Sequence, residues 1–215
     1  MTDTTLHPEL GEIPVFRGRR LILVVTGSLP AAHTPFWTNW LRRAYPETEL
    51  RVVLTRSAGR FVTRQALAPL SGTAVEMDLW PDEPSTSALH VELAEWADTF
   101  VVAPATLSFC TRLANGMCDS PVLLAMQCST VPQVLAPALP PGGLTSRAYE
   151  RAREMLAEAP HVAVVPPVAG LSSTTGRWDA ALNAPMPTVI ATAERLRTAI
   201  ARQRTAGRPD TRAAS

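Results

Sequence analysis

The sequence predicts an α/β protein with a single three-layer domain, in which a doubly wound parallel sheet of the Rossmann or flavodoxin-like kind carries helices on both faces. Apolar runs of strand length alternate along the chain with stretches of helical pattern, which predicts such a sheet. The first run, residues 21–25, is continuously aliphatic, as in a strand buried on both faces. The chain has 215 residues, of which 46% are hydrophobic, and can therefore bury one core.

The first two predicted strands each lead through a turn of small residues into a helix. The strand at residues 21–25 ends in Thr26-Gly27-Ser28, and Pro30 then begins a helix that continues to about residue 45. A second strand at residues 50–54 is followed by a turn at 55–58 and a helix through about residue 67. Strand, turn and helix in this order can hold a phosphate on helix N-terminal amides.

The middle of the chain repeats this layout. Residues 100–103 form a predicted strand bounded by Pro104, and residues 105–114 a helix closed by Asn115 and Gly116, which tolerate left-handed backbone. The remaining elements are a short strand at 73–77, a Pro-rich loop at 80–87, a helix at 87–96 capped by Ser87, apolar strand-like runs at 122–126, 133–136 and 162–165, and helices at about 145–156 and 187–203.

The composition excludes several classes of function. All 20 basic residues are arginine, and the absence of lysine excludes both Schiff-base chemistry and a phosphate-loop lysine. The net charge is +1 and the arginines are scattered, so we expect no nucleic-acid partner. No apolar run approaches the roughly 20 residues that cross a bilayer, and no signal-peptide pattern begins the chain, so we expect no membrane partner and a cytoplasmic location.

The three cysteines, Cys110, Cys118 and Cys128, predict neither a metal site nor a disulfide framework. Their number is odd, and their spacings match no zinc-binding pattern. We expect reduced thiols and no bound metal.

Small hydroxyl residues follow three of the predicted strands. They are Thr26 and Ser28, Thr55 and Ser57, and Thr106 and Ser108. An open parallel sheet binds its ligand at such strand ends, so this pattern predicts a nucleotide-like ligand. The first turn lacks the full Gly-x-Gly-x-x-Gly spacing, and taken alone Gly27 is equally well explained as part of a tight turn.

Residues 97–119 resemble the signature of the homo-oligomeric flavin-containing cysteine decarboxylases. That signature is Pro-Ala-Ser-Ala-Asn-Thr, a helix, and Ala-Asn-Gly-Ile-Cys-Asp or a close variant. Residues 114–119, Ala-Asn-Gly-Met-Cys-Asp, keep its second half. In the first half Ser108 replaces the asparagine and Phe109 the threonine. The resemblance spans about residues 19–197. It implies bound FMN or FAD, and assembly as a trimer or dodecamer.

The resemblance implies a set of flavin-contacting residues. Phe61 has a second interpretation as a core residue, Asn115 as a helix cap, and Cys118 and Asp119 as local packing and turn capping. The implied set is Thr26, Gly27, Ser28, Thr55, Ser57, Phe61, Pro104, Ala105, Thr106, Ser108, Asn115, Cys118 and Asp119.

His90 is the predicted catalytic residue, because it matches the position of the histidine that the family needs for turnover. Histidine is the side chain type that ordinarily changes charge near neutral pH, which suits proton transfer. A second family motif carries an asparagine that holds the substrate carboxylate, and Pro140 stands in its place. The amides of Gly142 and Gly143 are candidate replacements, and Arg177 is a candidate carboxylate or phosphate partner in a hydroxyl-rich loop that resembles the family's substrate-covering segment.

The implied function is oxidative decarboxylation of the C-terminal cysteine of a precursor peptide to an enethiol, which leads to aminovinyl-cysteine. Two alternatives stay open: phosphopantothenoylcysteine decarboxylase of coenzyme A synthesis, and a flavin-binding pseudoenzyme or regulatory subunit. The expected organisation is a flexible arm at residues 1–16, a flavoprotein decarboxylase domain at 17–203 and a disordered tail at 204–215.

Overall fold

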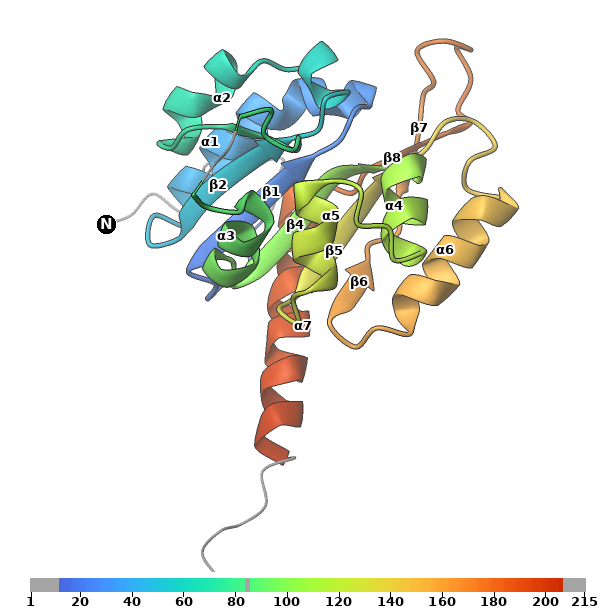
Figure 1. Ribbon diagram of the computed structural model, residues 1–215. Coiled ribbons are helices and arrows are strands. Elements are labelled where there is room, and N and C mark those ends of the chain that lie inside the picture. The colour runs from blue at the N-terminus through green and yellow to red at the C-terminus, as the bar shows by residue number, and fades with distance from the viewer. Residues whose placement is uncertain (1–11, 84–85, 207–215) are drawn as a thin grey trace, which may run out of the picture.

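The computed structural model describes residues 12–83 and 86–206, and its centre is a six-stranded parallel sheet (Figure 1). The strand order is β3-β2-β1-β4-β5-β6, so the order reverses between β1 and β4. This is the strand order of the Rossmann fold, and it confirms the predicted fold class. The strands are β1 (Arg20–Val25), β2 (Glu49–Leu54), β3 (Glu76–Met77), β4 (Thr99–Thr106), β5 (Gln133–Ala138) and β6 (Val162–Val164).

Helices cover both faces of the sheet and make the three predicted layers. The side chains of β1 alternate between two cores: Leu21 and Leu23 pack toward α1, α2 and α7, whereas Ile22 and Val24 pack toward α3, α4, α5 and α6. Figure 1 shows α7 running past the sheet, with its last turns projecting beyond the body of the molecule. The helices are η2 (Leu29–His33), α1 (Thr34–Ala44), η3 (Ala58–Arg60), α2 (Arg64–Ser71), α3 (Leu89–Trp96), α4 (Leu107–Ala114), α5 (Pro121–Gln127), α6 (Arg147–Ala157) and α7 (Met186–Ala206).

One predicted strand is wrong: residues 122–126 lie in helix α5. Ser120 caps this helix by accepting a hydrogen bond from the Leu123 amide, and Pro121 occupies its first turn. The Val122 amide donates to the buried carboxylate of Asp78 at 2.9 Å. Because α5 is buried on nearly all sides, its sequence is a continuous apolar run that pattern alone cannot distinguish from a buried strand.

Several predicted boundaries shift. Helix α3 begins at Leu89 with Ala88 as its N-cap, not at Ser87, and β4 continues through Pro104 to Thr106. Helix α7 extends to Ala206, inside the predicted tail. In the predicted arm, the carbonyl of Pro14 accepts a hydrogen bond from the Tyr45 hydroxyl. The rest of the arm, residues 1–11, and of the tail, residues 207–215, lies outside the described residues.

A short antiparallel hairpin, which the sequence did not predict, lies beside the carboxyl end of β5. It consists of β7 (Val168–Gly170) and β8 (Ala180–Leu182). The backbones of Leu139 and Ala181 exchange hydrogen bonds of 2.8 and 3.2 Å, which attach the hairpin to the chain just after β5. Strands of three residues are too short to show an alternating pattern.

Candidate active site

A cavity of about 410 Å³ lies at the carboxyl edge of the sheet, where the strand order reverses. Its walls are the loops after β1, β4 and β5 and the loop of the β7–β8 hairpin. Five of the predicted site residues line it: Gly27, Ser28, Thr106, Ser108 and Pro140. The crevice at such a reversal point is where open α/β sheets bind their ligands.

Thr26 joins the ends of β1 and β4. Its hydroxyl donates to the carbonyl of Pro104 at 2.8 Å and accepts from the amide of Thr106 at 2.9 Å. The residue is 2% exposed and does not line the cavity. Thr26 therefore positions the two loops that form the crevice, and a bound ligand would not reach its hydroxyl. Pro104 takes part through the carbonyl that accepts from the Thr26 hydroxyl. Neither Pro104 nor Ala105, its neighbour in β4, lines the cavity.

Gly27 allows the loops after β1 and β2 to touch. A Cβ at this position would lie 2.3 Å from the Cβ of Ser57 and 2.7 Å from its carbonyl carbon. Gly27 does not have a positive φ, so close approach requires glycine here and backbone conformation does not. The requirement explains why the turn contains glycine even though the Gly-x-Gly-x-x-Gly pattern is incomplete.

Ser28 places a buried hydroxyl, without a hydrogen-bond partner among the described residues, at the wall of this cavity. Opposite it, the Thr106 hydroxyl caps α4 by accepting from the Phe109 amide, and the first-turn amides of α4 have no acceptor within the helix. An unpaired hydroxyl beside a helix N-terminus fits the phosphate of a flavin nucleotide.

The predicted contacts after β2 lie outside this cavity. The Thr55 hydroxyl accepts from the Ala58 amide at 3.3 Å, and Ser57 is exposed against Gly27. Phe61 is interpreted from the sequence either as a flavin contact or as a core residue. Its side chain is 39% exposed, so Phe61 is not a core residue. Of these three residues, Ser57 lies against Gly27 in the loop after β1, and none lines the cavity.

His90 also lies outside the cavity, in a cluster on α3 and the loop after α4. The ring of Trp80 meets that of His90 edge-on, with ring centroids 5.6 Å apart, and the Trp80 indole donates to the carbonyl of Asp119 at 3.3 Å. The Nδ1 atom of His90 is buried and has no hydrogen-bond partner among the described residues. Leu79, Val91 and Met117, close by in sequence, have exposed apolar side chains.

The Asn-Gly-Met-Cys-Asp loop has the capping roles that its residues suggest. The Asn115 side-chain amide donates to the carbonyl of Thr111 at 2.7 Å, and Gly116 has the left-handed φ of +69°. The Cys118 thiol is exposed. Arg112 donates to the Asp119 carboxylate at 2.6 and 3.1 Å and lowers the pKa of that carboxyl. None of these residues lines the cavity.

Three of the four predicted substrate-binding residues are placed elsewhere. Pro140 lines the cavity, but the Gly143 amide donates to the Pro140 carbonyl at 2.8 Å in a tight turn, so it is not free to bind an anion. Gly142 completes the same turn with a φ of +75° and does not line the cavity. The Arg177 guanidinium pairs with Asp179 at 2.8 Å and its side chain is 70% exposed.

Sequence reasoning missed two features of the structure, one in the cavity and one outside it. One is the apolar wall of the cavity, made by Leu139, Leu171 and Leu182, because the hairpin that supplies two of these leucines was not recognised. The other is Asp78, which is 5% exposed and whose pKa is raised by burial. The only sequence signal for Asp78 is an acidic residue directly after a short strand.

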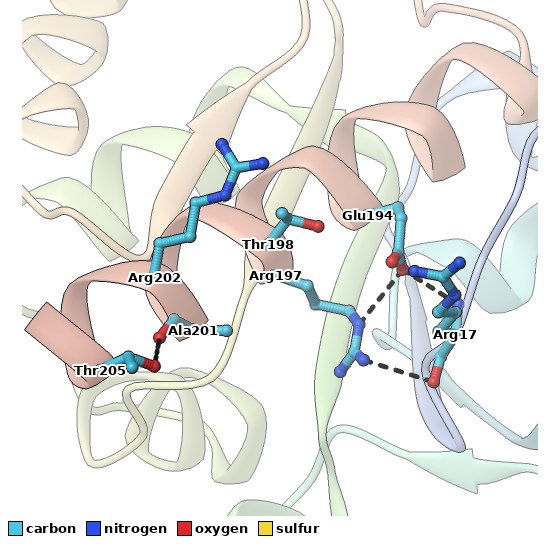
Figure 2. A pocket seen from close by; sticks show the side chains of 7 residues that line it. All are labelled: Arg17, Glu194, Arg197, Thr198, Ala201, Arg202 and Thr205. Carbon is cyan, nitrogen blue, oxygen red and sulfur yellow. Dashed lines mark hydrogen bonds and ion pairs between the residues drawn. The ribbon is translucent and has the colours of Figure 1, made fainter.

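A second, larger groove of about 610 Å³ lies at the opposite end of the molecule and contains none of the predicted site residues. Figure 2 shows it along the outer half of α7, where Glu194 lies between Arg197 and Arg17. Glu194 accepts from the Arg197 guanidinium at 3.3 Å and from the Arg17 amide at 2.9 Å. Since Arg17 precedes β1, this groove is at the amino edge of the sheet, away from the crevice.

Comparison with known proteins decides the family. The sequence pattern of the Flavoprotein family matches residues 15–194. The chain belongs to the flavoprotein family. This flavoprotein is 34% identical over 182 residues to a cypemycin cysteine dehydrogenase (decarboxylating) from a Streptomyces species, covering 85% of the chain and 94% of that relative. It is also 37% identical over 122 residues to the bifunctional coenzyme A biosynthesis protein CoaBC of Haemophilus influenzae, covering 57% of the chain and 30% of that protein.

Solved structures of cysteine decarboxylases are similar to this chain in fold. The crystal structure of the cypemycin decarboxylase CypD superposes on the flavoprotein with a TM-score of 0.71 at 32% identity, covering 87% of this chain and 98% of that one. The FMN-dependent cysteine decarboxylase SpaF superposes with a TM-score of 0.67 at 26% identity, covering 81% and 97%. These likenesses confirm the predicted family and its flavin cofactor. Among the described residues, no helix is both long and apolar enough to cross a membrane.

Proposed function

We propose that this flavoprotein is an FMN-dependent enzyme that oxidatively decarboxylates the C-terminal cysteine of a precursor peptide to an enethiol. One observation carries the proposal: the likeness to the cypemycin enzyme extends over 94% of that relative, whereas the match to CoaBC covers 30% of that larger protein. The family match at residues 15–194 includes the crevice loops and the hairpin, which together form the cavity.

The crevice residues fit the cofactor. The unpaired Ser28 hydroxyl and the first-turn amides of Leu107 and Ser108 on α4 would hold the FMN phosphate. The bound flavin supplies a hydride acceptor, so that the thiol-bearing carbon is oxidised and an electron sink stands beside the carboxylate that is lost. Leu139, Leu171 and Leu182 shield the reacting atoms from water.

His90 would move the thiol proton, and this role requires a second copy of the chain. Within one chain, His90 and the Asn115–Asp119 loop lie outside the cavity. The side chains of Val91, next to His90 in the sequence, of Met117 in the loop, and of Leu79, next to Trp80, are exposed. Exposed apolar side chains that gather around a functional residue are typical of an interface. We propose a homo-oligomer, a trimer or a dodecamer, in which this surface of one copy faces the cavity of its neighbour.

The test is to incubate the purified protein with a synthetic peptide that ends in cysteine, and in parallel with phosphopantothenoylcysteine. We expect the protein to carry an oxidised flavin spectrum, and the peptide to lose the mass of carbon dioxide and two hydrogens. Turnover of phosphopantothenoylcysteine alone would assign the protein to coenzyme A synthesis instead. A protein that binds flavin and converts neither substrate would be a pseudoenzyme.

A further inference from the structure

The cavity contains a substrate carboxylate in the proposed reaction, yet no arginine or histidine side chain lines it in the described part of the chain. Pro140 stands where the resemblance places an asparagine, and it has neither a side-chain donor nor an amide proton. The Gly143 amide is used within its turn, and Arg177 is paired with Asp179. Within the chain that forms the cavity, donors for the carboxylate are therefore sought in the rest of the wall.

The hairpin loop supplies such donors. Ser172, Ser173 and Thr174 line the cavity together with Pro140 and Pro141. The hydroxyls of Ser173 and Thr174 make no hydrogen bond within the described residues. Both residues are exposed, so their hydroxyls can exchange hydrogen bonds to water for bonds to a ligand without losing a bond within the protein.

The loop is held in shape independently of these two hydroxyls. The Ser172 amide donates to the Arg177 carbonyl at 2.8 Å, and the Gly176 amide donates to the Ser172 carbonyl at 2.8 Å. The Ser172 hydroxyl accepts from the Thr175 amide at 3.2 Å, and the Thr175 hydroxyl donates to Asp179 at 3.0 Å. Ser173 and Thr174 therefore sit on a closed turn whose bonds are made by its other members.

We infer that Ser173 and Thr174 bind the carboxylate of the C-terminal cysteine and replace the asparagine that Pro140 has displaced. This inference rests on the proposed function and names the residues that recognise the substrate's charged end. On the loops after β1 and β4, the Ser28 hydroxyl is the one proposed for the FMN phosphate, and the Thr106 hydroxyl caps α4. In this arrangement the FMN phosphate is bound by the loops after β1 and β4, and the substrate carboxylate is bound by the hairpin loop.

The experiment compares binding of two unreactive peptides that end in serine in place of cysteine, one with a free carboxylate and one with a C-terminal amide. The flavin-loaded wild-type protein should bind the acid more tightly. The double variant Ser173→Ala, Thr174→Val should lose this preference, with the affinity for the acid falling about tenfold to a hundredfold, as for hydrogen bonds to a charged group, and the affinity for the amide little changed. Thr198→Val is the matched control: it removes an exposed hydroxyl on α7, outside the cavity and the hairpin loop, and should keep the preference.

A rescue variant sharpens the test. Adding Pro140→Asn to the double variant should restore the preference for the acid, because the amide donor returns to the cavity wall. The inference is overturned if the double variant still prefers the acid as the wild type does, or if the wild type shows no preference. The proposed function is checked separately by wild-type turnover of the cysteine peptide, so that turnover with an unchanged preference in the double variant refutes this inference alone.

Discussion

The hydroxyl of Thr26 accepts the amide proton of Thr106 across 2.9 Å, and so joins two strand ends that are 80 residues apart in the sequence. The same hydroxyl donates to the Pro104 carbonyl, and its burial excludes water as an alternative partner. The crevice between β1 and β4 thus depends on one side chain that no ligand would touch.

Replacement of this hydroxyl tests its role. Thr26→Val removes two buried hydrogen bonds at nearly constant volume and leaves the Thr106 amide without a partner, which we expect to lower the free energy of unfolding by about 1–3 kcal/mol. The flavin Kd should rise, because the α4 N-terminus is no longer held. Urea unfolding and flavin titration measure the two effects. Thr26→Ser keeps the hydroxyl and should stay close to the wild type.

Gly27→Ala should abolish flavin binding. The added methyl group would meet both the side chain and the carbonyl carbon of Ser57, so the loops after β1 and β2 must separate. Because backbone atoms take part in the clash, adding Ser57→Gly should not restore binding fully. Gly59→Ala is the matched control: a Cβ there has nothing within 4 Å, and we expect normal flavin absorbance. Normal flavin binding by Gly27→Ala would show that the two loops move freely.

His90→Asn should leave flavin binding intact and abolish decarboxylation, because it removes the proton carrier at similar size. Flavin absorbance and peptide mass spectrometry distinguish the two outcomes. His161→Asn, just before β6, is the control for a general effect of losing a histidine. Unchanged turnover in His90→Asn would make His90 a structural residue.

Val91→Glu should weaken assembly and, with it, turnover. Val91 is 49% exposed on α3 next to His90, and a charge there would be buried without a partner in the proposed interface. We expect the molar mass from light scattering and the turnover rate to fall together. Val15→Glu, at a position that is 64% exposed and distant in sequence from this surface, should change neither. A fully active monomer would contradict the proposed assembly.

The buried carboxyl of Asp78 predicts a pH effect on stability. Burial raises its pKa in the folded state, so the folded protein holds this proton more tightly than the unfolded chain. The contribution of Asp78 is therefore fully present below the unfolded pKa and is lost as pH rises through the folded pKa. Asp78→Asn keeps an acceptor for the Val122 amide and should not show this loss. Relative to the wild type, it should gain stability between acidic and neutral pH, as measured by urea unfolding at a series of pH values.

The local pattern of the sequence predicted the central parallel sheet, with residues 122–126 wrongly added as a strand, and a crevice at the carboxyl edge of that sheet. Continuous aliphatic runs such as residues 21–25 mark doubly buried strands, and small hydroxyl residues after them, such as Ser28 and Thr106, mark the crevice. The aliphatic runs and the hydroxyl residues that follow them can both be recognised from residues adjacent in the sequence. The quoted signature at residues 97–119 was sufficient for the family, because it is a contiguous pattern.

The tertiary structure alone decided which of the candidate groups are free to act. Hydrogen bonds to Asp78 and Ser120 hold the start of the helix at residues 121–127. The Gly143 amide is used by the turn at Pro140, and Arg177 is paired with Asp179. The hairpin loop brings Ser173 and Thr174 to the cavity. Each outcome depends on a hydrogen bond or a contact whose partner the sequence pattern does not identify. Residue types and their spacing state what a side chain can donate or accept, and the folded chain determines whether that capacity is already used.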